Sequence, residues 1–197
     1  MIVIGIPTMG SIPTKVVGCI GKVIREFGSE VELYCTNHSL VYDARHALFQ
    51  YALNSGADLV FIDSDILFSP EAFRQLLSHK KPIVSGLYYG RSIPSRPIAY
   101  SKVKPTNLFR DKPELVQLKP EELEPFMEVA GVGLGFCLIR HEVLKAVNVD
   151  GKNPFEPFGN MGEDFSFLQR CKKKGYKIYL DTTLGLKHIG EYEYGKV

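Results

Sequence analysis

Two aspartates with one serine between them directly follow an apolar run in this chain: Asp63, Ser64 and Asp65 come after residues 58–62. A buried strand that ends on two carboxylates delivers them to the rim of a sheet, where open α/β folds bind ligands. Carboxylate oxygens suit hard divalent cations, and a cation held there would in turn hold a diphosphate. The same tripeptide is also ordinary turn chemistry, because Asp and Ser side chains accept hydrogen bonds from nearby backbone N–H groups. Both interpretations stay open on these three residues alone.

A second acidic pair, Glu163 and Asp164, stands directly after Gly162, where a helix is expected to begin. Acidic residues in the first turn of a helix are favoured by the helix dipole, which would by itself explain the pair. The apolar approach over residues 157–161 favours a different role, because it would present the pair to a cleft. A carboxylate there would be able to take a proton from an attacking hydroxyl.

Three more residues have side chains suited to a ligand site. His188 lies beyond the last expected strand, and its neutral imidazole would suit Mn²⁺ beside carboxylates, although a lone histidine is usually a surface or packed residue. Asp43 and Arg45 stand at the start of an expected helix. They would read a nucleotide, with the guanidinium on phosphate and the carboxylate on a base or ribose edge. The alternative is a surface pair that does not share a helical face.

Strand-like and helix-like patterns alternate through the first half of the chain, which predicts a parallel sheet flanked by helices. Strands are expected at residues 2–7, 31–36, 58–62, 82–88, 128–139 and 176–181, and helices at 14–27, 42–54, 70–79, 141–147 and 163–174. Gly131, Gly133 and Gly135 would let the backbone approach a ligand closely, or would mark a bulged strand. Residues 89–119 hold prolines and scattered basic residues, which indicates a long loop or a short hairpin of the kind that often carries function.

Composition excludes several classes of protein. The 197 residues carry 24 basic and 22 acidic side chains, and a net charge of +2 gives no electrostatic case for nucleic acid. No apolar stretch approaches the roughly 20 residues that span a bilayer, and residues 1–7 are typical of a first strand and not of a signal peptide. Four cysteines without metal-ligand spacing are expected to be reduced thiols of a cytoplasmic protein.

In their order along the chain these segments resemble the GT-A glycosyltransferases of the family 2 type. The likeness lies in the strand with Asp-x-Asp, the glycine-rich segment 132–144, the block 162–181 and the terminal His-Ile-Gly. Its most specific part is the block 162–181 together with His188, because Asp-x-Asp is short enough to recur by chance. The resemblance implies a GT-A (Rossmann-like) three-layer α/β/α sandwich with a mostly parallel central sheet. It also implies a single domain over 1–197, with a nucleotide-binding half (1–88) and an acceptor and catalytic half (89–197).

The family also implies an activity: metal-dependent transfer of a sugar from a UDP- or GDP-linked donor to an unknown acceptor hydroxyl, with inversion. Asp164 matches the general base, with Glu163 beside it. The metal set for Mn²⁺ or Mg²⁺ would be Asp65, His188 and Asp63, of which Asp63 would mainly face the ribose or sugar. The donor-binding set would be Pro7, Thr8, Asp43, Arg45, Asp63, Ser64 and Gly133. The segment 89–119 would choose the acceptor or close over the donor.

Two alternatives stay open beside this resemblance. A nucleotidyltransferase has a similar sheet and also uses carboxylate-bound Mg²⁺, but usually carries a glycine-rich basic loop after its first strand. Residues 7–13 contain one glycine and no basic residue. A non-catalytic module that binds sugar nucleotides is the second alternative. The presence of Asp63, Asp65, Asp164 and His188 together argues against it, because a degenerate site would be free to lose any of them.

Overall fold

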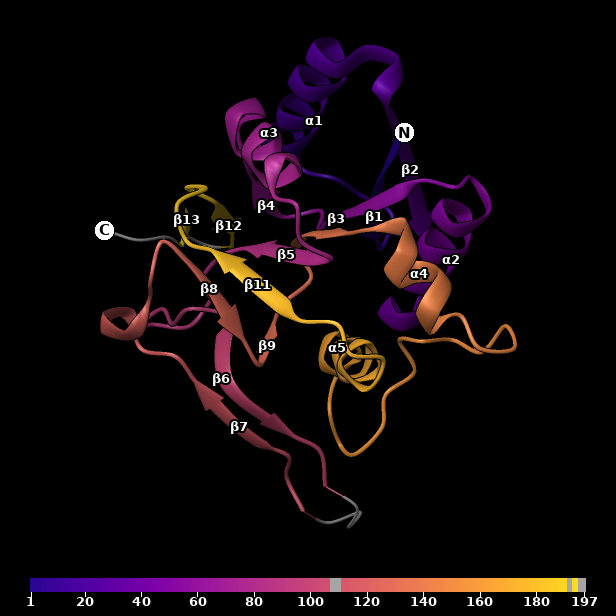
Figure 1. The fold of residues 1–197 in the computed structure, drawn as a ribbon. Helices are drawn as coiled ribbons and strands as arrows, with labels where there is room; N and C mark the ends of the chain where they lie inside the picture. The colour runs from indigo at the N-terminus through magenta and orange to yellow at the C-terminus, as the bar shows by residue number, and fades with distance from the viewer. Residues whose placement is uncertain (107–110, 191–192, 195–197) are drawn as a thin grey trace.

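The structure, a computed structural model, describes residues 1–106, 111–190 and 193–194. Its centre is a seven-stranded sheet with the order β2-β1-β3-β10-β5-β11-β8 (Figure 1). The strands are β1 (Ile2–Thr8), β2 (Val31–Asn37), β3 (Asp58–Ile62), β5 (Ile83–Gly86), β8 (Phe126–Val129), β10 (Phe136–Ile139) and β11 (Ile178–Asp181). Strands β1, β2, β3, β5 and β11 run in one direction, and β8 and β10 run against them. The mostly parallel sheet expected from the sequence is confirmed.

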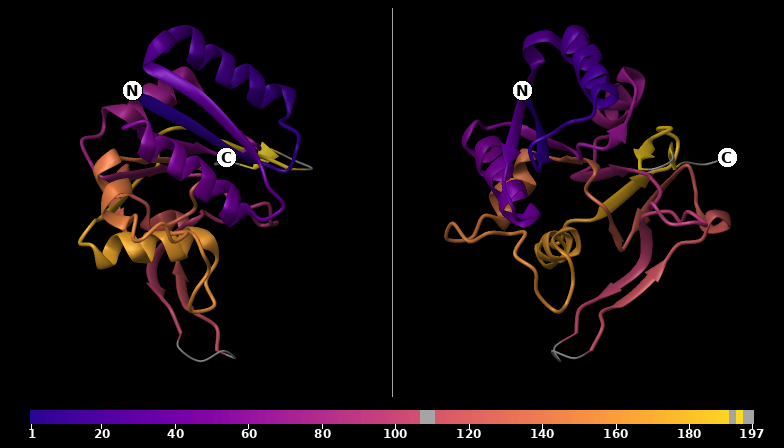
Figure 2. Two further views of the ribbon diagram at one scale, coloured as in Figure 1. Left: turned by 90° about the vertical axis from the view of Figure 1, so that its right-hand side faces the viewer. Right: turned by 180° about the vertical axis from the view of Figure 1, so that it is seen from behind.

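Helices cover both faces of this sheet, which makes three layers (Figure 2). They are α1 (Thr14–Phe27), α2 (Val41–Asn54), α3 (Pro70–Ser78), α4 (His141–Val147) and α5 (Glu163–Lys173), with short 3₁₀ turns η1 (Gly28–Glu30) and η2 (Pro120–Glu122). Successive strand residues point to opposite faces. Val3 and Leu59 therefore pack with α2, α4 and α5, whereas Ile4 and Val60 pack with α1 and α3. Across the described residues, no helix combines the length and apolar character needed to cross a membrane.

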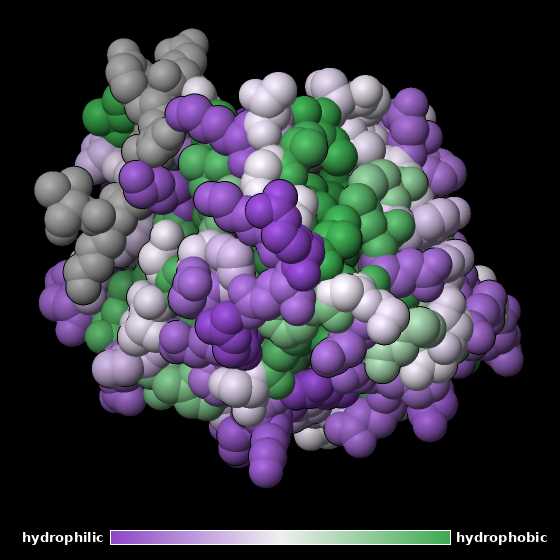
Figure 3. Space-filling view, turned by 90° about the horizontal axis from the view of Figure 1, so that it is seen from above, coloured by the Kyte–Doolittle hydropathy of each residue, from purple (hydrophilic) through white to green (hydrophobic). Residues whose placement is uncertain are grey.

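Helix α1 shows how the outer layer is attached. Val16, Ile20 and Val23 recur at i, i+4 and i+7, and form the buried stripe that faces the sheet. Val17 and Ile24 on the same helix are exposed. Seen from above, in the view that brings α1 and α3 towards the reader, the surface accordingly mixes apolar and polar side chains (Figure 3).

The segment expected as one strand over 128–139 is three strands, so that prediction was wrong. The chain leaves the central sheet after β8, forms β9 (Gly131–Val132) in a second sheet, and returns as β10 between β3 and β5. Glycine permits the crossing, because a Cβ at Gly131 would lie only 2.7 Å from a methyl group of Val103. Strands from both halves of the chain thus share one sheet, and the division at residue 88 stays a prediction.

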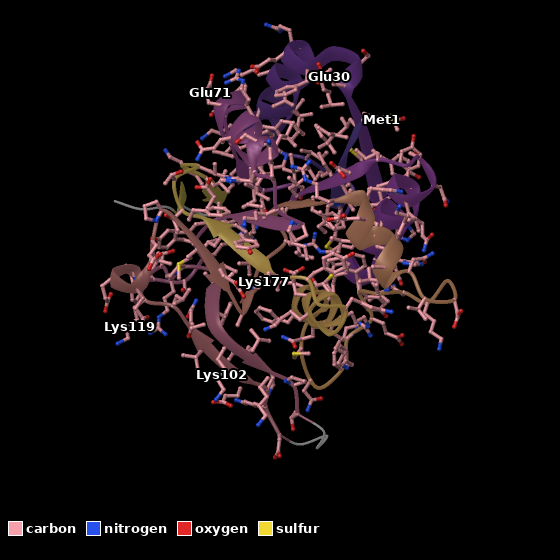
Figure 4. The ribbon with its side chains drawn as sticks, in the orientation of Figure 1. Met1, Glu30, Glu71, Lys102, Lys119 and Lys177 are labelled. Atoms are coloured by element: carbon pink, nitrogen blue, oxygen red, sulfur yellow. The ribbon has the colours of Figure 1, made fainter. Side chains whose placement is uncertain are left out.

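The segment 89–119 contains the hairpin that the sequence left as one option. Strands β6 (Ala99–Lys104) and β7 (Glu114–Gln117) pair with each other, and β6 also pairs with β9. The hairpin projects from the body below β8 (Figure 1), and Lys102 lies at the opposite end of the molecule from Glu71 (Figure 4). Its base packs on α5 through an edge-on contact between the rings of Tyr100 and Phe165, whose centroids are 4.9 Å apart.

A third small sheet joins the end of the chain to the turn after β3. It has the order β13-β12-β4, with β4 (Ile66–Leu67), β12 (Lys187–Ile189) and β13 (Glu193–Tyr194). His188 was expected beyond the last strand, whereas it lies within β12. The reason is a non-local pairing that sets His188 opposite Ile66, one residue from Asp65.

Candidate functional site

The turn of Asp63, Ser64 and Asp65 lies between the carboxyl end of β3 and β4. The N–H of Asp63 donates to the carbonyl of Gly135 at 2.8 Å, and the N–H of Ile66 donates back to the carbonyl of Asp63 at 3.1 Å. These bonds fix the turn between neighbouring strands. Both carboxylates thus stand at the sheet rim, where the sequence predicts them.

Arg45 joins the two acidic motifs. Its side chain is 3% exposed, and its Nη2 lies 3.0 Å from Asp63 Oδ1. Its Nε lies 3.2 Å from Asp164 Oδ1 and 3.7 Å from Glu163 Oε1. Burial lowers the pKa of Arg45, but the neighbouring carboxylates of Asp63, Asp164 and Glu163 outweigh burial and raise it, so the guanidinium stays charged. Its observed partners are carboxylates, and the predicted contact with phosphate stays a prediction.

Asp164 occupies the first turn of α5, where its carboxylate reaches across to the β9–β10 connection. The N–H of Leu134 donates to Asp164 Oδ2 at 3.1 Å. Oδ1 is buried and has no hydrogen-bond partner among the described residues. Burial raises the pKa of Asp164 to about 7, against the opposing effect of Arg45. A carboxylate with a pKa near neutrality is suited to accept a proton in catalysis.

Asp65 and His188 meet through the β4–β12 pairing. His188 Nε2 lies 3.3 Å from Asp65 Oδ1, and His188 Nδ1 lies 2.9 Å from the carbonyl oxygen of Tyr89. Since a carbonyl only accepts, that contact assigns the proton to Nδ1 and leaves Nε2 with a lone pair. Burial lowers the pKa of His188, which favours the neutral ring.

Two residues of this site were not selected from the sequence. Arg91 forms an ion pair with Asp65 Oδ2, and its Nε donates to His188 Nε2 at 3.1 Å. Tyr88 is buried, and its hydroxyl oxygen accepts from the N–H of Gly135 at 3.1 Å. Arg91 looked like one of several scattered loop cations, and Tyr88 like an ordinary strand residue, so the sequence carried no specific signal for either.

Gly133 has a steric reason to be glycine. A Cβ at this position would lie 2.0 Å from the Tyr88 hydroxyl oxygen. The Tyr88 ring also packs edge-on against His188, with centroids 5.5 Å apart. The close approach expected at Gly133 is thus made by a side chain of this protein, and contact with a donor there stays a prediction.

Matches to known proteins come from structure alone. No family model and no curated protein matches the chain. The crystal structure of A197 from STIV superposes with a TM-score of 0.65 at 20% identity, over 96% of this chain and 85% of that one. GalNAc-T7, solved with UDP, GalNAc and Mn²⁺, gives a TM-score of 0.61 at 12% identity over 96% of this chain. This chain spans 43% of its length.

The catalytic domain of Drosophila β1,4-galactosyltransferase 7, solved with xylobiose, gives a TM-score of 0.58 at 16% identity, over 100% of this chain and 75% of that one. The chain has a GT-A glycosyltransferase fold. At these identities the likeness establishes the fold, and the chemistry must be argued from the site.

Within this GT-A fold, the other predicted donor residues flank the acidic turn. Strands β1 and β3 are parallel neighbours, so Pro7 and Thr8 at the end of β1 lie at the same sheet edge as Asp63. The Thr8 hydroxyl accepts from the N–H of Gly10 and donates to the carbonyl of Ser11, both at 3.0 Å. In the first turn of α2, Asp43 Oδ1 accepts from the Asn153 amide at 3.3 Å. Their contact with a nucleotide stays a prediction.

The ligand types at the rim fit a divalent cation. Asp65 Oδ1 is buried and lacks a hydrogen-bond partner within the described part of the chain, and His188 Nε2, which accepts from Arg91 Nε, lies 3.3 Å from it. A carboxylate oxygen and a neutral imidazole nitrogen both suit Mn²⁺.

The pair has no third protein ligand of the usual kind, because across residues 1–106, 111–190 and 193–194 no three His, Cys, Asp or Glu side chains gather as one metal site. Asp63 is paired with Arg45, and its place in the metal set stays a prediction.

Contacts between charged side chains define this site. A cavity of about 530 Å³ lies elsewhere, beside β8 and β11, and its lining includes Met127, Tyr176 and Lys177. At the rim, the guanidinium groups of Arg45 and Arg91 lie against the acidic side chains. The assignment of the site therefore rests on charge and contact geometry and not on volume.

Proposed function

We propose that this protein is a metal-dependent glycosyltransferase that moves a sugar from a nucleoside-diphosphate donor to an acceptor hydroxyl, with inversion at the anomeric carbon. The observation that carries the proposal is the junction of the two acidic motifs on a GT-A fold. Arg45 lies 3.0 Å from Asp63 and 3.2 Å from Asp164, although about a hundred positions separate these acids in the sequence. Donor and acceptor chemistry would then meet at one rim of the sheet.

Asp65 and His188 would hold Mn²⁺ or Mg²⁺, which when bound neutralises charge on the departing diphosphate. Asp63 and Ser64 would lie along the ribose or sugar of the donor. Pro7, Thr8, Asp43, Arg45 and Gly133 complete the proposed donor site. UDP is the first nucleotide to test, because GalNAc-T7 was solved with UDP and Mn²⁺.

Asp164 would act as the general base, with Glu163 beside it. The acceptor oxygen forms its bond to the anomeric carbon as the bond from that carbon to the diphosphate oxygen breaks, and the hydroxyl proton passes to the Asp164 carboxylate. Oδ2 accepts from the N–H of Leu134, and Oδ1 lies 3.2 Å from Arg45 Nε, so both oxygens are held in place at the rim. Because the pKa of Asp164 is about 7, transfer should increase as the pH rises through neutrality.

Calorimetry with UDP and GDP, each with and without Mn²⁺, tests the donor site. Asp65→Ala should abolish the Mn²⁺-dependent part of nucleotide binding, whereas Asp111→Ala, an exposed aspartate on the hairpin, should leave it unchanged. If neither nucleotide binds under either condition, the donor-site assignment is wrong.

Release of UDP from UDP-sugars in the presence of a panel of acceptors tests the base. Asp164→Asn should bind nucleotide almost as well as the wild type while losing transfer. Glu163→Gln, a matched change on the neighbouring residue, should retain most of the transfer activity. Full turnover by Asp164→Asn would rule out Asp164 as the base.

A further inference from the structure

Arg91 bridges the two residues that would hold the cation. Its Nε donates to His188 Nε2 at 3.1 Å, and its Nη2 forms an ion pair with Asp65 Oδ2. One guanidinium therefore serves both the imidazole and the carboxylate. It provides positive charge at the place where the proposed function needs a metal ion.

This arrangement excludes simultaneous binding of a metal by the same atoms. The contact between Nδ1 and the Tyr89 carbonyl assigns the imidazole proton to that nitrogen, so Nε2 has one lone pair to give. That lone pair accepts either from Arg91 or binds a metal, and not both. A divalent cation beside the guanidinium would also experience charge repulsion at short range.

The position of Arg91 lets its side chain leave without disturbing the core. It lies on a loop closed at its base, where the N–H of Gly90 donates to the carbonyl of Arg96 at 2.9 Å and Tyr89 bridges to Pro97. The loop backbone is thus anchored, whereas the Arg91 side chain is 48% exposed. Release of the guanidinium needs only side-chain rotation into solvent.

We propose that Arg91 is an internal counter-cation, which occupies the Asp65–His188 pair in the metal-free protein and competes with a divalent cation for it. This rests on the metal-dependent function proposed for the same site. Arg91 stabilises the empty site and weakens metal binding, so its two effects have opposite signs. A residue with a merely structural role would instead stabilise the fold and also favour metal binding, because it would hold the ligand side chains in place.

The test measures Mn²⁺ affinity by calorimetry in the wild type, Arg91→Ala, Arg91→Lys and Arg96→Ala. Arg96 is a matched control, because it is an exposed arginine on the same loop. We expect Arg91→Ala to bind Mn²⁺ about tenfold more tightly than the wild type, which corresponds to about 1.4 kcal/mol. Arg91→Lys keeps the charge but loses the planar guanidinium, so its Mn²⁺ affinity should lie between those of the wild type and Arg91→Ala. Arg96→Ala should match the wild type.

Thermal unfolding in EDTA supplies the second measurement. Arg91→Ala should unfold at a lower temperature than the wild type without metal, and should gain more from added Mn²⁺. Equal or weaker Mn²⁺ binding by Arg91→Ala would overturn the competition while leaving the metal-dependent function intact. Failure of every variant to bind Mn²⁺ would overturn both, and UDP binding measured without metal would then show whether the donor site survives.

Discussion

Replacement of Arg45 by methionine removes the guanidinium at the junction of the two acidic motifs and keeps an unbranched side chain at this position. The Arg45 side chain is 3% exposed, and its guanidinium nitrogens lie 3.0, 3.2 and 3.7 Å from carboxylate oxygens of Asp63, Asp164 and Glu163. The substitution removes this positive charge. At an effective dielectric constant of about 20, each such pair interacts by about 5 kcal/mol, most of which offsets desolvation of the guanidinium. Removal of one partner from a buried group of charges typically costs about 3–5 kcal/mol, and we expect a loss of this size at pH 8.

The loss should depend on pH because Arg45 lowers the pKa of Asp164, which burial holds at about 7. A carboxyl whose folded pKa exceeds its unfolded value contributes its full stability at low pH and loses it as the pH rises through the folded pKa. In Arg45→Met the pKa of Asp164 rises further. Above pH 7 the folded variant therefore holds a proton that the folded wild type has released. The deficit should be about 1 kcal/mol larger at pH 8 than at pH 6.

Urea unfolding at both pH values measures this difference. Arg25→Met is the control, because Arg25 lies exposed in the last turn of α1, and should change stability by less than about 0.5 kcal/mol. Adding Asp164→Asn to Arg45→Met should recover part of the loss, since one uncompensated carboxylate disappears. An equal deficit at pH 6 and pH 8, or a loss below about 1 kcal/mol, would refute the reasoning.

Two further substitutions test packing and hydrogen bonding. Gly133→Ala should cost about 1–3 kcal/mol in urea unfolding, because its Cβ would lie 2.0 Å from the Tyr88 hydroxyl oxygen. Gly18→Ala, on a helix surface with no atom within 4 Å of the new Cβ, should instead stabilise the fold by up to about 1 kcal/mol. Burial raises the pKa of Asp181, but hydrogen bonds, first among them that from Thr183, outweigh burial and lower it. Asp181→Asn should therefore unfold at a lower temperature than the wild type at pH 7, and the gap should close as the pH falls through the lowered pKa; a gap that persists at low pH would contradict this account.

Locally determined features of the fold could be read from the sequence. The strand over 58–62 and its acidic turn follow from an apolar run that stops on polar residues. The start of α3 follows from Ser69, whose hydroxyl accepts from the N–H of Ala72 at 3.1 Å, with Pro70 as the first helical residue. Both features depend only on residues that are close together in the sequence.

Features that depend on distant pairing could not be read in this way. The apolar pattern over 128–139 is compatible with one strand, and only contacts with β3, β5 and β6 divide it into three. The contacts of Arg91 likewise depend on where His188 lies. That position is set by β12, a strand of three residues that is too short to show the alternation of apolar and polar residues typical of a strand. The sequence therefore supplied candidate residues whose roles stay predictions, and it did not supply Arg91, Tyr88 or the contacts that each candidate makes.

The short pairing of β4 with β12 makes assembly of the rim a local folding equilibrium. Strands of two and three residues hold His188 beside Asp65, and the N–H of Ile189 donates to the carbonyl of Asp65 at 2.7 Å. So small a sheet opens at a far lower free energy than the core, and each opening separates His188 from Asp65. If this pair holds a cation as proposed, its apparent affinity equals the intrinsic affinity multiplied by the closed fraction, and bound cation should slow amide exchange at Ile189.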